Sequence, residues 1–338
     1  MNVLLKCFFE HFESMERNSL HARYKRRDLV EYFNTLIEGC RLGENSDSQT
    51  VVREAIVCIL RYHQKSKTEN GGVCLMGKYH NVLYVGLKLC FDWGLRDTAT
   101  VAALLDDIYH CEGTFERLMI GALFGTRAPH FIAGWKSDFD SQEENVRAMV
   151  YYLDHATNAN LEYACGHENK RFIDVPIDSC GKATCLKIVV QLGVPDKLLI
   201  LLRYGARIYD EDNDDEETVV DIILNRLTEC DRSYPYNIVS CLQLVLRAMP
   251  RICIQADCSR STRGSFQTQM DIVLARYPYL VQDCILPASR CGFQPPELKH
   301  LCRCVIRYQL WINYQLPNGI RLLPIPGSLH KYIDIMED

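Results

Sequence analysis

A helical unit that starts, turns and ends in the same way recurs in the middle of the sequence. Residues Thr184 to Ala206 hold two short apolar segments, which Gly193 separates and Gly205 ends. Their apolar residues recur at helical spacing, and glycine allows the tight turn that a helix pair needs. A second start of this form begins at Thr218, 34 residues after Thr184 (218 − 184). The pattern predicts an all-α chain of stacked helix pairs, with an irregular helical bundle as the alternative.

The unit at 184–206 resembles an ankyrin repeat, whose period is about 33 residues. The positions that carry the resemblance lie at the start of the first helix, at the central turn and at the end of the second helix. They are Thr184, Leu186, Gly193, Gly205 and Ala206 in the first copy, and Thr218 and Asp221 in the second. Segments 87–94, 118–125 and 146–153 look like weaker copies. The resemblance implies roughly four to six repeats, several of them degenerate.

A second patterned segment lies near the end of the sequence. Its apolar residues follow helical spacing and form one stripe: Leu298, Leu301, Cys302, Val305, Ile306 and Leu310. The polar residues between them face away from the stripe: Lys299, His300, Arg303 and Arg307. After a Pro-Asn-Gly turn, residues 323–326 read Leu-Pro-Ile-Pro, which is incompatible with a helix. Such a small unit must bury its stripe against another surface.

These two elements together resemble the SOCS box. The first helix of that module carries Leu, Cys and an aliphatic residue four positions apart, here Leu298, Cys302 and Ile306. Its second element is Leu-Pro-hydrophobic-Pro, matched by 323–326. The resemblance implies that elongin C binds to Leu298, Leu301, Cys302, Val305 and Ile306. It implies that a cullin binds near Leu323, Pro324, Ile325 and Pro326.

Ankyrin repeats followed by a SOCS box are the layout of the ankyrin-repeat and SOCS-box family, which the chain resembles. That resemblance implies the substrate-recognition subunit of a ubiquitin ligase, assembled with elongin B, elongin C, a cullin and a RING protein. Cullin-5 is favoured over cullin-2. The chain itself would catalyse nothing: its repeats would bind an unidentified protein substrate and promote its ubiquitination and degradation. The alternative is an ankyrin-repeat scaffold that takes no part in a ligase.

The sequence predicts four parts of different character. They are a helical cap without repeats at 1–70, degenerate ankyrin repeats at 71–255 (clearest at 178–250), a linker with one helix at 256–292, and the SOCS box at 293–338. A cap is expected because the first repeat of a stack otherwise exposes an apolar face.

The charge balance argues against several classes of partner. The formal net charge is −5 over 338 residues, so we expect neither nucleic acid nor a membrane as partner. No apolar run approaches the roughly 18 residues that a membrane span needs, and no secretory signal is evident. We therefore expect a cytoplasmic location, with the nucleus as a further one. The acidic run 210–217 is either a patch for a basic target or a solvated loop.

The sequence contains 17 cysteines, whose spacing suggests no disulfide framework and a reducing compartment. Two alternatives use their chemistry. A zinc site could be built from Cys165, His167, Cys180 and Cys185, although the spacing matches no common zinc pattern. A cysteine-dependent enzyme would need a nucleophile motif, and none surrounds any cysteine. We expect no catalytic residue, no metal and no cofactor.

Overall fold

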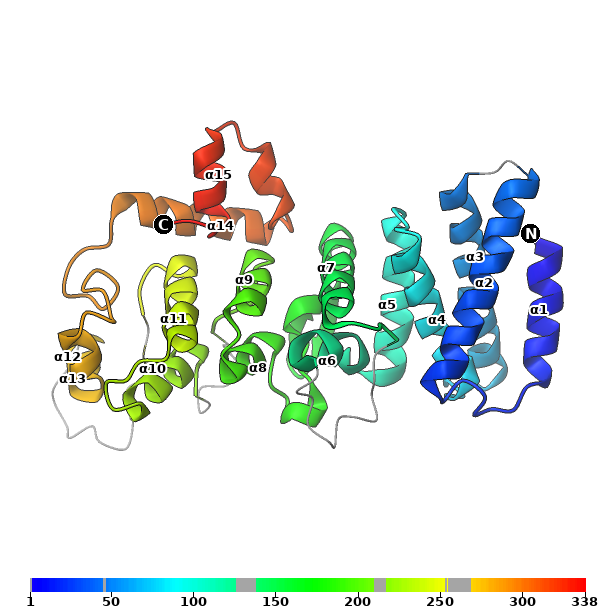
Figure 1. Cartoon of the computed structure of the whole chain (residues 1–338), viewed down its shortest axis with the longest axis horizontal. Coiled ribbons are helices and arrows are strands. Elements are labelled where there is room, and N and C mark those ends of the chain that lie inside the picture. Colours follow the sequence, from blue (N-terminus) through cyan, green and yellow to red (C-terminus); the bar gives the residue numbers. More distant parts are fainter. Residues whose placement is uncertain (1, 45–46, 126–137, 210–216, 253, 255–268) are drawn as a thin grey trace. The chain divides into compact units, whose positions relative to one another are not determined.

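The structure is a computed structural model that describes residues 2–44, 47–125, 138–209, 217–252, 254 and 269–338. Helices dominate the described residues, so the all-α prediction is confirmed (Figure 1). The departure from it is one small two-stranded sheet, formed by β1 (Glu162–Cys165) and β2 (Glu168–Arg171). The chain divides into two compact units: unit 1 comprises residues 1–163 and 177–182, and unit 2 comprises 164–176 and 183–338.

Unit 1 is built from seven α-helices among its described residues, with a short 3-10 helix, η4 (Asp178–Cys180). The α-helices are α1 (Asn2–Ser14), α2 (Arg23–Glu44), α3 (Ser48–Glu69), α4 (Lys78–Asp92), α5 (Thr98–Glu112), α6 (Glu116–Phe124) and α7 (Gln142–Asn158). Helix α4 packs on α2, α3 and α5, and α7 packs on α5 and α6. The segment that we expected to be a cap consists of α1 to α3. Its capping role remains a prediction.

The α-helices of unit 2 begin with two stacked pairs. They are α8 (Cys185–Leu192) with α9 (Pro195–Arg203), and α10 (Val219–Glu229) with α11 (Tyr236–Ala248). The first helices of the two pairs pack on each other, as do the second helices (Figure 1). This like-on-like stacking buries a continuous apolar layer, which includes Leu186, Leu198, Leu201, Ile223 and Leu242. It is the arrangement of an ankyrin repeat stack.

The two repeat starts are closed by side-chain caps. The hydroxyl of Thr184 accepts the Lys187 amide at 3.3 Å. Thr218 accepts the Asp221 amide at 3.1 Å, and the Asp221 carboxylate accepts the Thr218 amide at 3.3 Å. This reciprocal capping box satisfies two amides that the first turn of α10 would otherwise leave unpaired. The repeat period in the sequence is therefore the period of helix caps in the structure.

The turn inside the first repeat depends on a missing side chain. Gly193 ends α8 with φ at 65°, a backbone conformation that suits glycine. A Cβ placed there would lie 2.8 Å from the side chains of Asn237 and Ile238 at the start of α11. The Asn237 amide also donates to the Gly193 carbonyl at 3.0 Å. Gly193 therefore allows the second pair to approach the first closely.

A short 3-10 helix of unit 2, η3 (Phe172–Asp174), precedes the repeats. The helices that follow them are α12 (Gln269–Arg276), α13 (Pro278–Gln282), α14 (Leu298–Ile312), η6 (Asn318–Leu322) and α15 (Gly327–Ile333). The segment 256–292, for which we expected one helix, contains two in its described part. Of the acidic run 210–217, all but Glu217 lies outside the described residues. No described helix combines the length and the apolar character needed to cross a bilayer.

Replacing Thr218 by alanine should lower the free energy of unfolding by about 1 kcal/mol, because the capping box of α10 loses its hydroxyl. Chemical denaturation followed by circular dichroism measures the change. Thr228→Ala is a matched control, since the Thr228 hydroxyl donates to the Leu224 carbonyl within the same helix. Equal loss in both variants would show that the cap contributes nothing specific.

Candidate functional site

Helix α14 turns an apolar face to the surface. Leu298 is 76% exposed and Val305 is 60% exposed, with the exposed Cys302 between them. Tyr308 and Ile312 extend this exposed face toward the end of the helix. Steps of four and three residues place these side chains on one side of a helix. We call Leu298, Cys302, Val305, Tyr308 and Ile312 the apolar face of α14.

The opposite face of α14 is polar and buried. It consists of His300, Arg303 and Arg307, followed by the apolar Leu310, and none is more than 6% exposed. The sequence correctly placed the three polar residues away from the stripe. It did not show that this polar side, and not the apolar one, packs against the rest of the chain. Leu310 belongs to the buried side, which corrects its assignment to the partner-facing stripe.

Arg307 can be buried because it bonds the ends of two helices. Its guanidinium donates to the Leu202 carbonyl of α9 at 2.5 Å and to the Ile333 carbonyl of α15 at 3.1 Å. The last carbonyls of a helix lack partners within it and carry partial negative charge, so a cation there is favourable. Burial lowers the Arg307 pKa to about 10, which still leaves the group charged at neutral pH. Arg307 thus ties the C-terminal segment that contains α14 and α15 to a repeat helix.

Arg303 and His300 extend this buried polar layer. Arg303 lies over the Tyr332 ring, 4.2 Å from its centre, and donates to His300 Nδ1 at 3.0 Å. His300 Nε2 lies 2.9 Å from the Met249 carbonyl oxygen. Because that oxygen only accepts, Nε2 carries the proton and Nδ1 is left as acceptor, which makes the ring neutral. Burial of the ring is the largest cause that lowers the His300 pKa, and the charge of the nearby Arg290 lowers it further.

Two ion pairs join the last residues to the repeats. Arg203 of α9 contacts the Asp334 carboxylate through three bonds of 2.6 to 3.0 Å. Arg247 of α11 contacts Asp338 at 2.6 and 2.7 Å. Partly exposed pairs of this kind contribute little free energy, but the bidentate geometry fixes orientation.

Gly205, predicted only as a helix terminator, also makes room for α14. A Cβ at this position would lie 2.6 Å from the Trp311 ring. The Arg171 guanidinium covers the same ring at 4.0 Å and donates to the Trp311 carbonyl at 2.6 Å. This ankyrin signature position therefore also allows α14, the helix that carries the apolar face, to pack closely on the repeat. No sequence pattern indicated this second role.

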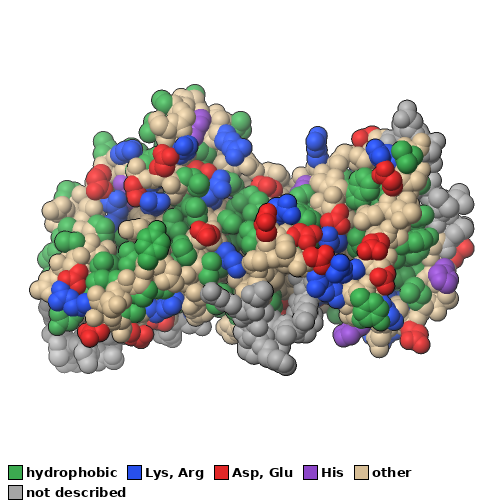
Figure 2. All heavy atoms as spheres, viewed as in Figure 1, with side chains coloured by type: hydrophobic (Ala, Val, Ile, Leu, Met, Phe, Trp, Pro, Cys, Tyr) green, Lys and Arg blue, Asp and Glu red, His purple; other side chains and the backbone are tan. Residues whose placement is uncertain are grey.

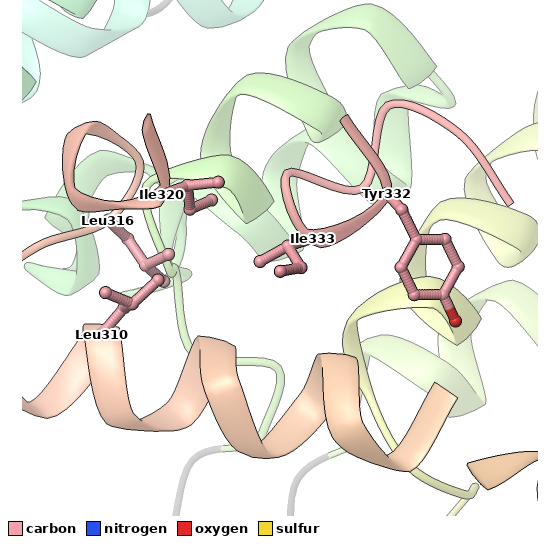
Figure 3. Close-up of a cluster of buried hydrophobic side chains, with 5 residues drawn as sticks. All are labelled: Leu310, Leu316, Ile320, Tyr332 and Ile333. Atoms are coloured by element: carbon pink, nitrogen blue, oxygen red, sulfur yellow. The ribbon is translucent and has the colours of Figure 1, made fainter. Parts of the chain in front are cut away.

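The segment has a small core of its own between α14, η6 and α15. Figure 3 shows Leu310 and Leu316 turned toward each other, and Ile320, Ile333 and Tyr332 above α14. Ile306, Leu323 and Ile325 pack against this cluster and are half-buried. Three residues that we assigned to partner binding thus also support the module from within.

The other predicted binding residues are open to solvent to different degrees. Pro324 and Pro326 are exposed, Leu301 is half-buried, and Leu322 beside the proline segment is 83% exposed. On the face drawn in Figure 2, hydrophobic and basic side chains both reach the surface over α14 and α15. The segment therefore offers two exposed apolar areas, one on α14 and one at 322–326.

Comparison with known proteins identifies this segment. Residues 294–334 match the SOCS box family. The chain is similar to ankyrin repeat and SOCS box protein 17 of Bos taurus, with 33% identity over 159 residues, 45% of this chain and 49% of that protein. The corresponding protein of Canis lupus familiaris is 31% identical over 46% of this chain and 46% of its own length. That of Mus musculus is 31% identical over 45% of this chain and 49% of its own length. The chain thus spans about half the length of the curated relatives it matches. No solved structure matches it significantly.

Acidification should loosen the attachment of α14. His300 has a lowered pKa in the folded chain, so below the ordinary histidine pKa of about 6.5 the unfolded chain binds the proton first. Stability is therefore lost as pH falls from that value toward the lowered one. Thermal unfolding midpoints between about pH 8 and about pH 5 measure the effect. His300→Gln should show a shallower decline than wild type, while His167→Gln, at an exposed position of unit 2, should follow wild type. Identical slopes for all three chains would contradict this role of His300.

Proposed function

We propose that this chain is an ankyrin repeat and SOCS box protein that acts as the substrate-recognition subunit of an elongin B/C–cullin–RING ubiquitin ligase. The SOCS-box match supports an adaptor of a cullin–RING ligase in general. The similarity to ankyrin repeat and SOCS box protein 17 of three mammals supports the repeat-plus-box layout. The elongin and cullin-5 assignments are the specific parts of the proposal.

The observation that carries the proposal is the apolar face of α14. A helix that buries its arginines and exposes Leu298 and Val305 leaves its most hydrophobic side without a partner within unit 2 among the described residues. Exposed apolar side chains at helical spacing are the means by which an amphipathic helix binds an apolar groove. We assign Leu298 as the anchor in elongin C and Cys302 as its neighbour. Leu301, Val305 and Ile306 complete the contact.

The proposed activity is catalysis by proximity. The repeats bind a protein substrate, and the SOCS box recruits elongin B/C, a cullin and its RING protein. The ligase then holds a lysine of the substrate near activated ubiquitin, which raises the effective concentration of the two reactants. The chain supplies binding surfaces and no reacting group. Ubiquitination and degradation of the substrate follow.

We further propose that residues 322–326 select cullin-5. Pro324 and Pro326 are exposed, and proline fixes the backbone of this segment in an extended form. Leu323 and Ile325 are held by the core beneath, so the exposed residues are presented on a fixed base. The exposed Leu322 adds apolar surface beside them.

Leu298→Ala should weaken binding to purified elongin B/C by about 2 kcal/mol or more, roughly a 30-fold rise in Kd, because a buried anchor carries much of the energy of such an interface. Isothermal titration with the full chain measures it. Leu42→Ala is a matched control, since Leu42 is 70% exposed on α2 of unit 1. Unchanged affinity of Leu298→Ala would remove Leu298 as anchor. A wild-type chain that binds no elongin B/C would instead favour the ankyrin scaffold without ligase function.

Pro324→Ala combined with Pro326→Ala should separate the two binding events. The double variant should keep elongin B/C, because the apolar face of α14 is untouched, and should lose cullin-5. Co-purification from matched preparations measures the recovery of elongin B/C, of cullin-5 and of cullin-2. Pro295→Ala, at an exposed proline before α14, serves as control. Equal recovery of both cullins by the double variant and wild type would contradict the assignment of 322–326.

A further inference from the structure

Four side chains of metal-binding type meet in unit 1. His63 lies on α3, Cys74 in the loop after α3, His80 at the start of α4 and Cys111 at the end of α5. The atoms that they can offer as ligands lie within 4.8 Å of one another. Both histidines are buried, and both cysteines are half-buried with free thiols. Within the described ranges, no other group of three or more potential ligands converges in this way. The alternative group from the sequence, Cys165, His167, Cys180 and Cys185, does not converge either.

Each histidine directs one ring nitrogen to a carboxylate. His63 Nδ1 lies 3.1 Å from Asp107 Oδ2, and His80 Nε2 lies 2.6 Å from Glu112 Oε1. An ionised carboxylate only accepts hydrogen bonds, so these two nitrogens carry hydrogen, and in each neutral ring the other nitrogen keeps a lone pair. A carboxylate behind the ring is the usual support of a metal-ligating histidine, because it fixes the tautomer and the ring orientation.

The two lone pairs belong to the nitrogens that remain for the cluster. His63 Nε2 lies 3.5 Å from Cys111 Sγ. His80 is only 1% exposed, and its Nδ1 has no hydrogen-bond partner in the part of the chain that the structure describes. A buried acceptor without a partner costs free energy, since it has lost water and gained nothing. A cation bound at this nitrogen would remove that cost.

The loop that carries Cys74 is held in place by several backbone contacts. The Met76 amide donates to Cys74 Sγ at 3.4 Å, a contact that favours the thiolate form. The Lys78 amide donates to the Arg17 carbonyl at 2.7 Å, and a Cβ on Gly77 would lie 2.5 Å from the Arg17 oxygen. Cys74 therefore reaches the cluster from a constrained loop, which lowers the entropic cost of binding an ion.

We propose that His63, Cys74, His80 and Cys111 form a tetrahedral zinc site. Two thiolates and two imidazoles are a ligand set that selects Zn²⁺. Ideal Zn–S and Zn–N bonds place ligand atoms about 3.3 to 3.8 Å apart, so the observed separations need only a small contraction. Four protein ligands leave no open position, which assigns the ion a structural role in joining α3, α4 and α5. The site is independent of the proposed ligase function, and it replaces our expectation that the chain binds no metal.

The test measures zinc in the full chain, purified with a non-thiol reductant after expression in zinc-supplemented medium. Elemental analysis should give close to one zinc per chain. Cobalt(II) added to the metal-free chain should give the visible bands of tetrahedral cobalt and a thiolate charge-transfer band. The cobalt spectrum is a readout of the wild-type chain, so it stands even if cysteine variants fold poorly. Removal of zinc by a chelator should lower the thermal unfolding midpoint.

Variants assign the ligands. Cys74→Ser and Cys111→Ser should each lose the zinc, whereas Cys58→Ser, at a half-buried cysteine of α3, and Cys165→Ser should keep it. Glu112→Gln should weaken zinc affinity by about 10- to 100-fold, because it changes the support of His80 and no ligand. A wild-type chain without zinc and without the cobalt bands overturns the proposal. So does a Cys74–Cys111 disulfide found by peptide mapping of the chain as purified, before any chelator is added.

Discussion

The contact on which unit 2 depends is a buried arginine at the ends of two helices. Arg307 of α14 donates to the Leu202 carbonyl of α9 and to the Ile333 carbonyl of α15. Because this charge is paired with helix termini, α14 can bury its polar side and leave its apolar side free. Lys78 follows the same principle in unit 1, where its ammonium donates to the Phe12, Glu13 and Met15 carbonyls at the end of α1. Buried cations at helix ends thus attach segments that are far apart in the sequence.

The parts that the sequence predicted are those encoded locally. Thr184 and Thr218 cap helices within three residues of themselves, so their repeat was visible without a structure. The stripe from Leu298 to Val305 was visible for the same reason, since helical spacing alone places it on one face. The side of α14 that is buried could not be predicted. The partners of its polar residues are backbone carbonyls such as those of Leu202 and Met249, which leave no trace in the sequence.

The proposed zinc ligands also could not be predicted from the sequence. They lie 11, 6 and 31 positions apart (74 − 63, 80 − 74, 111 − 80), a spacing that matches no local zinc motif. Three helices and one loop bring them together, so only tertiary packing reveals the group. The zinc alternative open from the sequence used a different group, with Cys165 and His167 two positions apart, and its spacing matched no common zinc pattern. A search for histidines backed by acidic residues one helix turn away would not have found them either, since Asp107 and Glu112 lie on α5.

Gly205 has a consequence for how such modules can be exchanged between proteins. The residue ends the repeat helix α9 and also leaves the space that Trp311 fills, so a side chain here would displace α14. A chimera that joined this SOCS box to foreign repeats would therefore need a glycine at the matching place, together with an arginine in the position of Arg203 to hold Asp334. The box and the repeat that carries Gly205 and Arg203 therefore form one structural block.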